Sequence, residues 1–183
     1  MSEAQPETDT KGKDLLFAQN RHGKTANTDD DREANAAGEP WKVMVIDDDD
    51  AVHQVTVMVL ADYTFENRPV EIIQGYSGGA GRNLMKKHPD TAVLLLDVVM
   101  ETDTAGLDAA KYIRDELHNH AVRIIIRTGQ PGQLPEESII SDYEINGYVS
   151  KTELTAQKLF SCLSKSLSDY NEMKKVSQQA EDH

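Results

Sequence analysis

The stretch Val45–Asp50, with the sequence VIDDDD, places four carboxylates directly after a short apolar run. Two like charges about 4 Å apart repel by about 4 kcal/mol at an effective dielectric of about 20. Such a cluster is therefore typical either of a fully solvated turn or of a site that holds a cation. The apolar residues before the acids predict a strand, and Val52, Val55 and Val59 after them share one face of a predicted helix.

Short apolar runs alternate with helical patterns along the rest of the chain. Several runs are apolar throughout, which is typical of strands covered on both faces. Ser77 is the predicted N-cap of the second helix, and the pattern from Leu154 to Tyr170 predicts an amphipathic fifth helix. The alternation predicts right-handed crossovers and a doubly wound α/β domain with a five-stranded parallel sheet. The predicted strands are Lys42–Ile46, Val70–Gln74, Ala92–Leu96, Val122–Arg127 and Gly147–Ser150.

Side chains that could bind a ligand or react follow four of these strands. Asp47 and Asp48 end the first strand, Asp97 the third, Thr128 the fourth and Lys151 the fifth. In a doubly wound sheet the ligand crevice lies beyond the carboxyl ends of the strands, so these side chains converge. Three carboxylates around one cavity favour a hard cation such as Mg²⁺. Asp97 ends the most apolar strand and is the natural acceptor of a phosphoryl group, whose charge Mg²⁺ and Lys151 would balance.

The two remaining acids of the opening stretch have a simpler interpretation. Asp49 and Asp50 are expected to face solvent in the first turn of the next helix, where negative charge favours the helix dipole. The lone Cys162 lies in a helical pattern, and packing is its predicted role.

Composition limits the classes of partner. The chain has 183 residues and a net charge of −13, which argues against a nucleic-acid or anionic-membrane surface, because both of these partners are polyanions. No apolar run approaches the roughly 20 residues needed to span a bilayer, and the N-terminus has no signal-peptide layout, so we expect a cytoplasmic protein. Residues 1–40 are polar and acidic and are expected to be largely disordered.

The motifs at the strand ends resemble, in their order and spacing, the receiver domain of bacterial two-component response regulators. The resemblance covers residues 41–170 and implies a flavodoxin-like receiver fold with strand order 2-1-3-4-5. The motifs that carry it are VIDD at 45–48, LLLD at 94–97, IIIRTG at 124–129 and GYVSK at 147–151.

The resemblance implies a set of roles at the metal site. Asp97 takes a phosphoryl group from a sensor histidine kinase or a phosphotransfer protein. Asp48 and Asp97 bind Mg²⁺ directly, Asp47 binds it through water, and the backbone carbonyl of Val99 completes the protein's ligands. Such a domain catalyses only its own phosphorylation and dephosphorylation, so we do not expect an enzyme that acts on other substrates.

The resemblance also implies a switch. Lys151 contacts the phosphoryl oxygens, Thr128 moves toward them, and Tyr148 turns inward to fill the vacated space. The readout is the surface formed by the fourth helix, the fifth strand and the fifth helix, which controls an output domain or a downstream protein.

Two features differ from the usual receiver motifs, and one points to a particular subclass of receivers. Thr152 follows Lys151 where receivers have a cis proline, and we expect a trans bond because a cis bond before a non-proline residue costs about 2.5 to 4 kcal/mol. The loop after Asp97 carries Glu101 and Asp103, which would add acid near the metal. The run Arg127–Gln133 resembles a receiver subclass that often precedes cyclic-dinucleotide signalling modules.

Other functions are compatible with an α/β fold of this kind, and the role of the C-terminal residues is open. A dehalogenase-type phosphatase would need an Asp where Val99 stands, and a flavodoxin-like electron carrier would need a phosphate loop in place of the acids at 47–50. A receiver fold that acts as an unphosphorylated interaction scaffold is the serious alternative. Residues 171–183 continue a helical stripe, which is compatible with a connecting helix, a homodimer seam or a polar tail.

Overall fold

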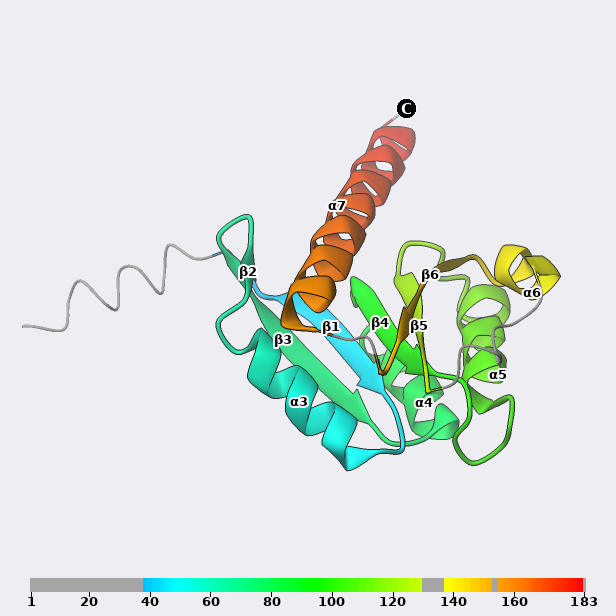
Figure 1. The fold of residues 1–183 in the computed structure, drawn as a ribbon. Coiled ribbons are helices and arrows are strands. Elements are labelled where there is room, and N and C mark those ends of the chain that lie inside the picture. Colours follow the sequence, from blue (N-terminus) through cyan, green and yellow to red (C-terminus); the bar gives the residue numbers. More distant parts are fainter. Residues whose placement is uncertain (1–37, 130–136, 153–154, 183) are drawn as a thin grey trace, which may run out of the picture. The chain divides into compact units, whose positions relative to one another are not determined.

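The computed structural model describes residues 38–129, 137–152 and 155–182, and the unit Glu39–His183 forms an α/β domain. Residues 1–37, which make up most of the segment predicted above to be disordered, lie outside the described residues. The domain is built on a six-stranded sheet in the order β2-β3-β1-β4-β5-β6 (Figure 1). The strands are β1 Trp41–Ile46, β2 Thr64–Phe65, β3 Arg68–Gly75, β4 Val93–Asp97, β5 Arg123–Thr128 and β6 Ile145–Ser150.

Five of the six strands run parallel. β1 pairs with β3 and β4, β4 pairs with β5, and β5 pairs with β6, so the predicted parallel sheet and its order 2-1-3-4-5 are confirmed. One additional strand, β2 at the edge of the sheet, was not predicted. It pairs antiparallel with β3 through a two-residue turn at Glu66 and Asn67, whose φ angles of 50° and 59° are those of a hairpin turn that needs two left-handed residues.

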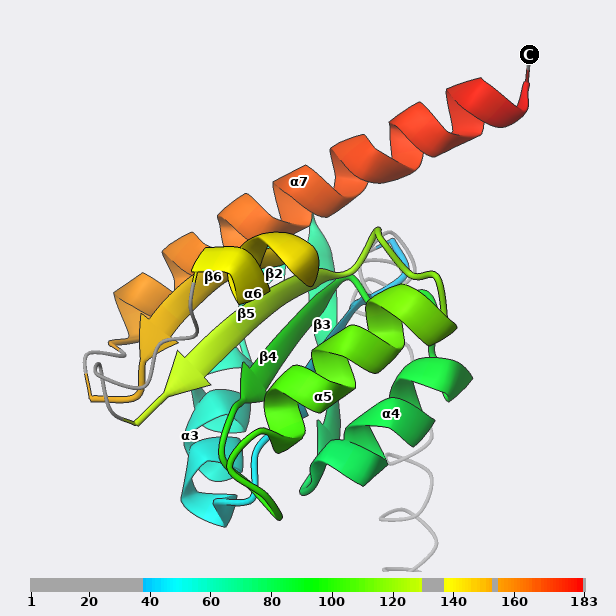
Figure 2. The ribbon, with the colours of Figure 1, turned by 90° about the vertical axis from the view of Figure 1, so that its right-hand side faces the viewer.

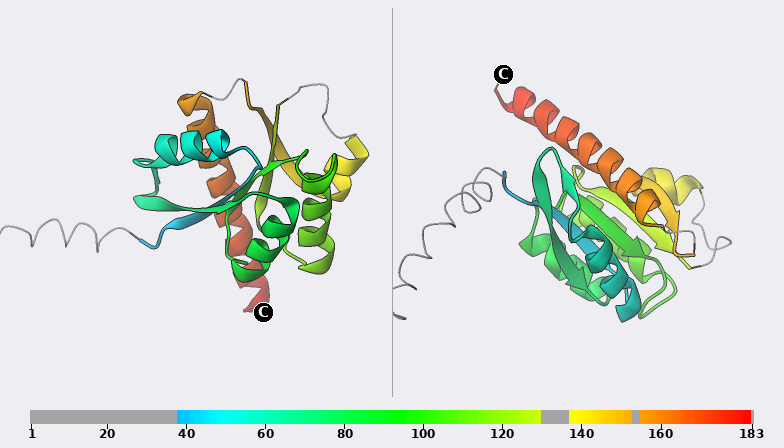
Figure 3. Two further views of the ribbon diagram at one scale, coloured as in Figure 1. Left: turned by 90° about the horizontal axis from the view of Figure 1, so that it is seen from below. Right: turned by 60° about the vertical axis from the view of Figure 1, so that its left-hand side comes forward.

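Helices cover both faces of the sheet. α3 and α7 lie on one face, and α4 and α5 on the other (Figures 2 and 3). α5 continues directly into a short π-helical segment, η1. No helix among the described residues is both long enough and apolar enough to cross a membrane. The helices are α3 Asp50–Leu60, α4 Gly78–Lys87, α5 Ala105–Lys111, η1 Tyr112–Glu116, α6 Glu137–Asp142 and α7 Ala156–Glu181.

The apolar strands form two cores, one on each face. Val43 and Val45 of β1 contribute to the core beneath α3 and α7, whereas Met44 and Ile46 contribute to the core beneath α4 and α5. Alternate side chains of a strand point to opposite faces, so a strand buried on both sides must be apolar at every position. The sheet is thereby held rigidly up to the residues that follow each strand.

The buried face of α3 differs in part from the predicted one. Of the three valines predicted to share one face of this helix, Val59 packs against the core but Val55 is 46 % exposed, and the residues buried most deeply are His53, Thr56 and Leu60. The helix is turned by polar contacts: His53 Nε2 lies 2.7 Å from the backbone oxygen of Asp47, and Thr56 Oγ1 accepts a hydrogen bond from Arg127. These tertiary partners outweigh the apolar pattern of the helix.

The other helix predictions agree with the structure. Ser77 caps α4, and its hydroxyl accepts a hydrogen bond from the backbone N–H of Ala80. The first half of α7 buries Leu159, Leu163 and Tyr170 against the sheet, as its amphipathic pattern predicted. Beyond Tyr170 the helix continues to Glu181 and extends away from the sheet (Figure 1).

A glycine fixes the start of α5 against the end of β4. The N–H of Gly106 donates to the backbone oxygen of Val98 at 2.9 Å. A Cβ atom at Gly106 would lie 1.9 Å from the backbone oxygen of Asp97, a contact that neither backbone can relieve without moving. The close approach of α5 therefore depends on the absence of a side chain at this position.

We expect Gly106→Ala to lower the free energy of unfolding by about 2 to 4 kcal/mol, because the added methyl group forces the backbone after Asp97 to move. The matched control is Gly79→Ala in the first turn of α4, where a Cβ atom meets nothing nearer than 3.9 Å. This control is expected to be neutral or slightly stabilising, since alanine favours a helix over glycine. Equal urea midpoints for Gly106→Ala and the wild type would contradict the packing described here.

Candidate functional site

Three carboxylates meet at the carboxyl ends of β1 and β4. Asp47 and Asp48 follow the last residue of β1, and Asp97 is the last residue of the neighbouring strand β4. One carboxylate oxygen from each of the three lies within 4.8 Å of the others. Asp47 and Asp97 are buried, with 1 % and 6 % of their surface exposed, whereas Asp48 faces solvent. The sequence-predicted cluster is therefore brought together by the sheet.

The ammonium group of Lys151 lies between the two buried acids. Its Nζ atom is 2.8 Å from Asp47 Oδ2 and 3.1 Å from Asp97 Oδ2. The lysine reaches this place because β6 pairs with β5 and the N–H of Lys151 donates to the backbone oxygen of Thr128 at 2.8 Å. No peptide bond between described residues is cis, so the predicted trans Lys151–Thr152 bond is confirmed.

The electrostatics of the cluster follow from burial and from its mixed charges. Burial raises the pKa of Asp97, the nearby charge of Asp47 raises it further, and Lys151 offsets only part of this. Burial opposes the charged form of Lys151, but the hydrogen bonds and charges of Asp47 and Asp97 outweigh it and raise the lysine's pKa. The chain therefore carries a firmly protonated ammonium group beside a carboxylate whose charge is disfavoured.

An open cavity of about 320 Å³ lies above these groups. Its lining offers carboxylate, hydroxyl and backbone oxygens, which are the ligands that Mg²⁺ prefers, and among the described lining residues there is no imidazole or thiolate that would favour a softer metal. The donor set thus fits a hard divalent cation. The predicted site residues Asp48, Asp97, Val99, Thr128 and Lys151 all line the cavity, together with Asp49, Val98 and Gly129.

The other two acids of the opening stretch serve the start of α3. Asp49 is the N-cap, and its Oδ1 atom accepts a hydrogen bond from the N–H of Ala51 at 2.9 Å. Asp50 is exposed and accepts hydrogen bonds from Gln54 and Tyr76. Their predicted positions as solvent-facing acids at the start of the helix are confirmed.

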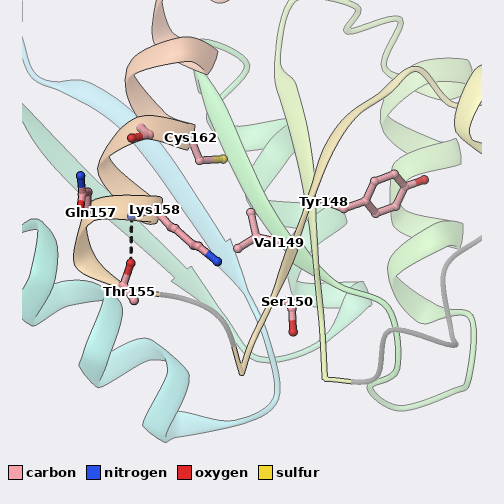
Figure 4. Close-up of a pocket in the computed structure, with 8 residues that line it drawn as sticks. Tyr148, Val149, Ser150, Thr155, Gln157, Lys158 and Cys162 are labelled. Carbon is pink, nitrogen blue, oxygen red and sulfur yellow. Dashed lines mark hydrogen bonds between the residues drawn. The ribbon is translucent and has the colours of Figure 1, made fainter.

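Tyr148 does not line the acidic cavity. Figure 4 shows its ring on the side of β6 away from Cys162 and Lys158 of α7. The ring packs at the edge of the core beneath α4 and α5. Its hydroxyl oxygen is buried and has no hydrogen-bond partner within the described part of the chain. An unpaired buried hydroxyl costs about 1 to 3 kcal/mol. This position of the Tyr148 ring therefore carries an energetic cost.

A second and larger cavity of about 590 Å³ lies between β6 and α7 (Figure 4). It contains none of the clustered acids and is lined by hydroxyl groups, the Cys162 thiol and the Lys158 side chain. Burial raises the pKa of Cys162, so its thiol stays protonated, in agreement with a packing role.

Two side chains near the cluster differ from what the sequence suggested. Glu101 was expected to add acid near the metal, but its Oε1 atom accepts a hydrogen bond from the N–H of Gly78 at 2.7 Å, and Glu101 does not line the acidic cavity. Arg127 was not predicted as a site residue, yet it is only 2 % exposed and lies in register with Asp97. A charged residue at the end of the apolar run IIIR was the signal in the sequence that could have identified it.

Comparison with solved structures places the fold of the chain among receiver domains. No protein-family model matches the chain. The chain is 46 % identical over 158 residues to 3′3′-cGAMP-specific phosphodiesterase 2 of Vibrio cholerae. The match covers 86 % of this chain but only 30 % of that protein.

Solved receiver domains share the fold. A response regulator receiver domain protein from Clostridium thermocellum superposes with a TM-score of 0.57 at 22 % identity, covering 74 % of this chain and 98 % of that one. The receiver domain of an HD domain-containing protein from Pseudomonas fluorescens gives a TM-score of 0.61 at 15 % identity, covering 74 % and 93 %. The chain therefore has the receiver fold predicted from its motifs.

Asp97→Asn is expected to raise the free energy of unfolding by about 1 kcal/mol in the absence of divalent cations, because burial and the charge of Asp47 disfavour the Asp97 carboxylate by more than Lys151 favours it. Since the folded-state pKa of Asp97 lies above the ordinary value, the folded chain binds this proton more readily than the unfolded chain, and the carboxyl's contribution to stability falls as pH rises through that interval. The control, Asp48→Asn, removes an exposed charge and should change stability less. Urea titrations in EDTA measure both, and a destabilised Asp97→Asn variant would contradict the prediction.

Tyr148→Phe is expected to stabilise the chain by about 1 kcal/mol, because it removes the unpaired buried hydroxyl. Tyr63→Phe is the matched control, since the Tyr63 hydroxyl lies 2.7 Å from Ser164 Oγ and its removal should cost about 1 kcal/mol. Thermal unfolding of both variants tests the pair. A loss of stability in Tyr148→Phe, like that expected for Tyr63→Phe, would show that the Tyr148 hydroxyl has a partner.

Proposed function

We propose that the chain is a phosphate-accepting receiver of a two-component system, in which Asp97 takes a phosphoryl group from a sensor histidine kinase or a phosphotransfer protein. The observation that carries this proposal is the ammonium group of Lys151 in contact with both Asp47 and Asp97. Three acids from the ends of β1 and β4 and a lysine from the end of β6 make a site with an acceptor, a place for a cation and a fixed positive charge.

The transfer is a displacement at phosphorus. A carboxylate oxygen of Asp97 attacks the phosphorus atom of a phosphohistidine, the P–N bond breaks, and its electron pair stays on the donor imidazole, which then takes up a proton. The product is an acyl phosphate on Asp97. When bound, Mg²⁺ would neutralise the charge that gathers on the phosphoryl oxygens during transfer.

The chain's own residues divide the remaining tasks. Asp48, Asp97 and the backbone carbonyl of Val99 would hold the metal, with Asp47 contributing through water. The ammonium group of Lys151, which contacts both Asp47 and Asp97, would turn to the phosphoryl oxygens once they arrive. Because the lysine is present before the reaction, its charge needs little rearrangement when the transferred charge develops.

The switch would run from Thr128 to the surface of α6, β6 and α7. Thr128 ends β5, lines the acidic cavity and is 5 % exposed, so it can approach new phosphoryl oxygens without a large backbone movement. Tyr148 would follow it inward. The Tyr148 hydroxyl, which has no hydrogen-bond partner among the described residues, supports this step, because a ring whose hydroxyl is left unpaired loses little energy on leaving its position.

The output is proposed from the similar Vibrio cholerae protein, of which the matched part is 30 %. We propose that phosphorylation here controls a cyclic-dinucleotide phosphodiesterase, either within a longer protein or as a separate partner. The part of α7 beyond Tyr170 would act as the connecting helix, since Met173 and Val176 are 37 % and 64 % exposed and offer apolar contacts to a further element.

Intact mass measured after incubation with Mg²⁺ and acetyl phosphate tests the acceptor directly. The wild type is expected to gain the mass of one phosphoryl group, and Asp97→Asn to gain none. Asp103→Asn is the control, because Asp103 is exposed, does not line the cavity and should be phosphorylated like the wild type.

A wild-type chain that gains no mass from acetyl phosphate or from a phosphorylated histidine kinase would reject the proposal. It would favour the interaction scaffold, for which the exposed Val55, Val57 and Met58 of α3 offer an apolar surface.

A further inference from the structure

The register of the sheet places a cation directly beside the acidic cluster. Arg127 of β5 pairs in register with Asp97 of β4, and Ile46 pairs with Leu96, so Asp47 is the next position along the same row. Val45, Leu95 and Ile125, each two residues earlier in its strand, belong to the core beneath α3 and α7. Since side chains two residues apart share a face, Asp47, Asp97 and Arg127 lie on that same face.

The guanidinium group of Arg127 is buried and poorly satisfied. Only 2 % of the residue is exposed, its Nη1 atom donates to Thr56 Oγ1 at 2.8 Å, and its Nε atom has no partner in the part of the chain that the structure describes. Burial lowers the pKa of Arg127, while the charges of Asp47 and Asp97 oppose this. An arginine stays charged even so, and a buried charge needs compensation.

A second buried arginine shows what a purely structural role looks like. Arg114 is also 2 % exposed, but its five hydrogen bonds tie η1 to the segment before β5, to the turn before β6 and to the start of β6, and they account for its burial. Among the described residues Arg127 has one hydroxyl partner instead, so its compensation comes from the two carboxylates in its row. The acceptors of Arg114 are the backbone oxygens of Asn119, Val122, Tyr143 and Glu144 and the side-chain oxygen of Asn146.

We propose that Arg127 sets the charge balance of the acceptor site, weakening Mg²⁺ binding to the unphosphorylated chain and stabilising the phosphorylated one. The inference rests on the proposed function and adds a residue to it. In this proposal the positive charge of Arg127 acts electrostatically on Asp47 and Asp97, and its side chain does not contact the phosphoryl group. Arg127 is therefore a positioning residue and not a catalytic one.

Counting charges gives the direction of both effects. Without metal, the two buried carboxylates are matched by two cations, the half-buried Lys151 and the buried Arg127. With Mg²⁺ bound and Asp48 included, the site carries one excess positive charge, which opposes the metal. When Asp97 then carries a dianionic phosphoryl group, the excess disappears and the site is neutral. Removing Arg127 would shift both states by one negative charge, which favours the metal and disfavours the phosphoryl group.

Titrations of three chains with two probes test the proposal. Mg²⁺ alone, followed by calorimetry, reports metal affinity, and beryllofluoride added at saturating Mg²⁺ reports the affinity for a phosphoryl-like dianion on Asp97. For Arg127→Met, which keeps the side-chain volume, we expect Mg²⁺ binding at least about threefold tighter and beryllofluoride binding at least about threefold weaker. Arg127→Lys retains the charge and should stay within about twofold of the wild type for both probes.

The opposite signs separate an electrostatic role from a structural one. A variant that merely loosens the fold would bind both probes more weakly, and that result, or no change for either probe, would overturn the inference. Thermal unfolding of all three chains shows that each is folded before it is titrated. If the wild type binds Mg²⁺ but no beryllofluoride, the proposed function fails while the metal half of the inference is still decided by Arg127→Met. If the wild type binds neither, both fall together.

Discussion

The contact of one ammonium group with two buried carboxylates determines the rest of the site. Asp47 and Asp97 would repel each other in a place that water reaches poorly, and Lys151 bridges them at 2.8 and 3.1 Å. The bridge keeps the acids together in the absence of a metal, and it holds a positive charge where a phosphoryl group would arrive. A site that is already charged and ordered before its ligands bind needs little reorganisation during the reaction.

The fold supplies this contact by topology and by close packing. Right-handed crossovers place β4 beside β1 and β6 at the end of the row, so residues that are distant in sequence meet at one edge of the sheet. Two cores hold the strands on both faces, and Gly106 lets α5 begin directly against the backbone of Asp97. The loop that carries Val99 is thereby fixed at its far end. Rigid strands and a short, anchored loop give the acids a defined separation.

Much of this arrangement could be predicted from the sequence, because parallel strands bring their carboxyl ends together and the reactive residues follow those ends directly. What failed depends on contacts between distant residues. The burial of Thr56 in α3 could not be read from the valine pattern, because Thr56 accepts a hydrogen bond from Arg127, 71 residues away, and an apolar pattern contains no information about that partner. The strand β2 was missed because Glu66 and Asn67 adopt left-handed conformations without the glycine that signals such a turn. The direction of Glu101 was equally hidden, since it depends on the position of α4.

A crystal structure of the chain grown with Mn²⁺ in place of Mg²⁺ would test the shared-cation site most directly, because anomalous scattering identifies the ion independently of the protein density. We predict one strong peak bound by carboxylate oxygens of Asp48 and Asp97 and by the backbone oxygen of Val99, with Asp47 in its outer coordination sphere. A map without a peak at these oxygens under saturating Mn²⁺, with the acids still gathered around Lys151, would contradict the central claim.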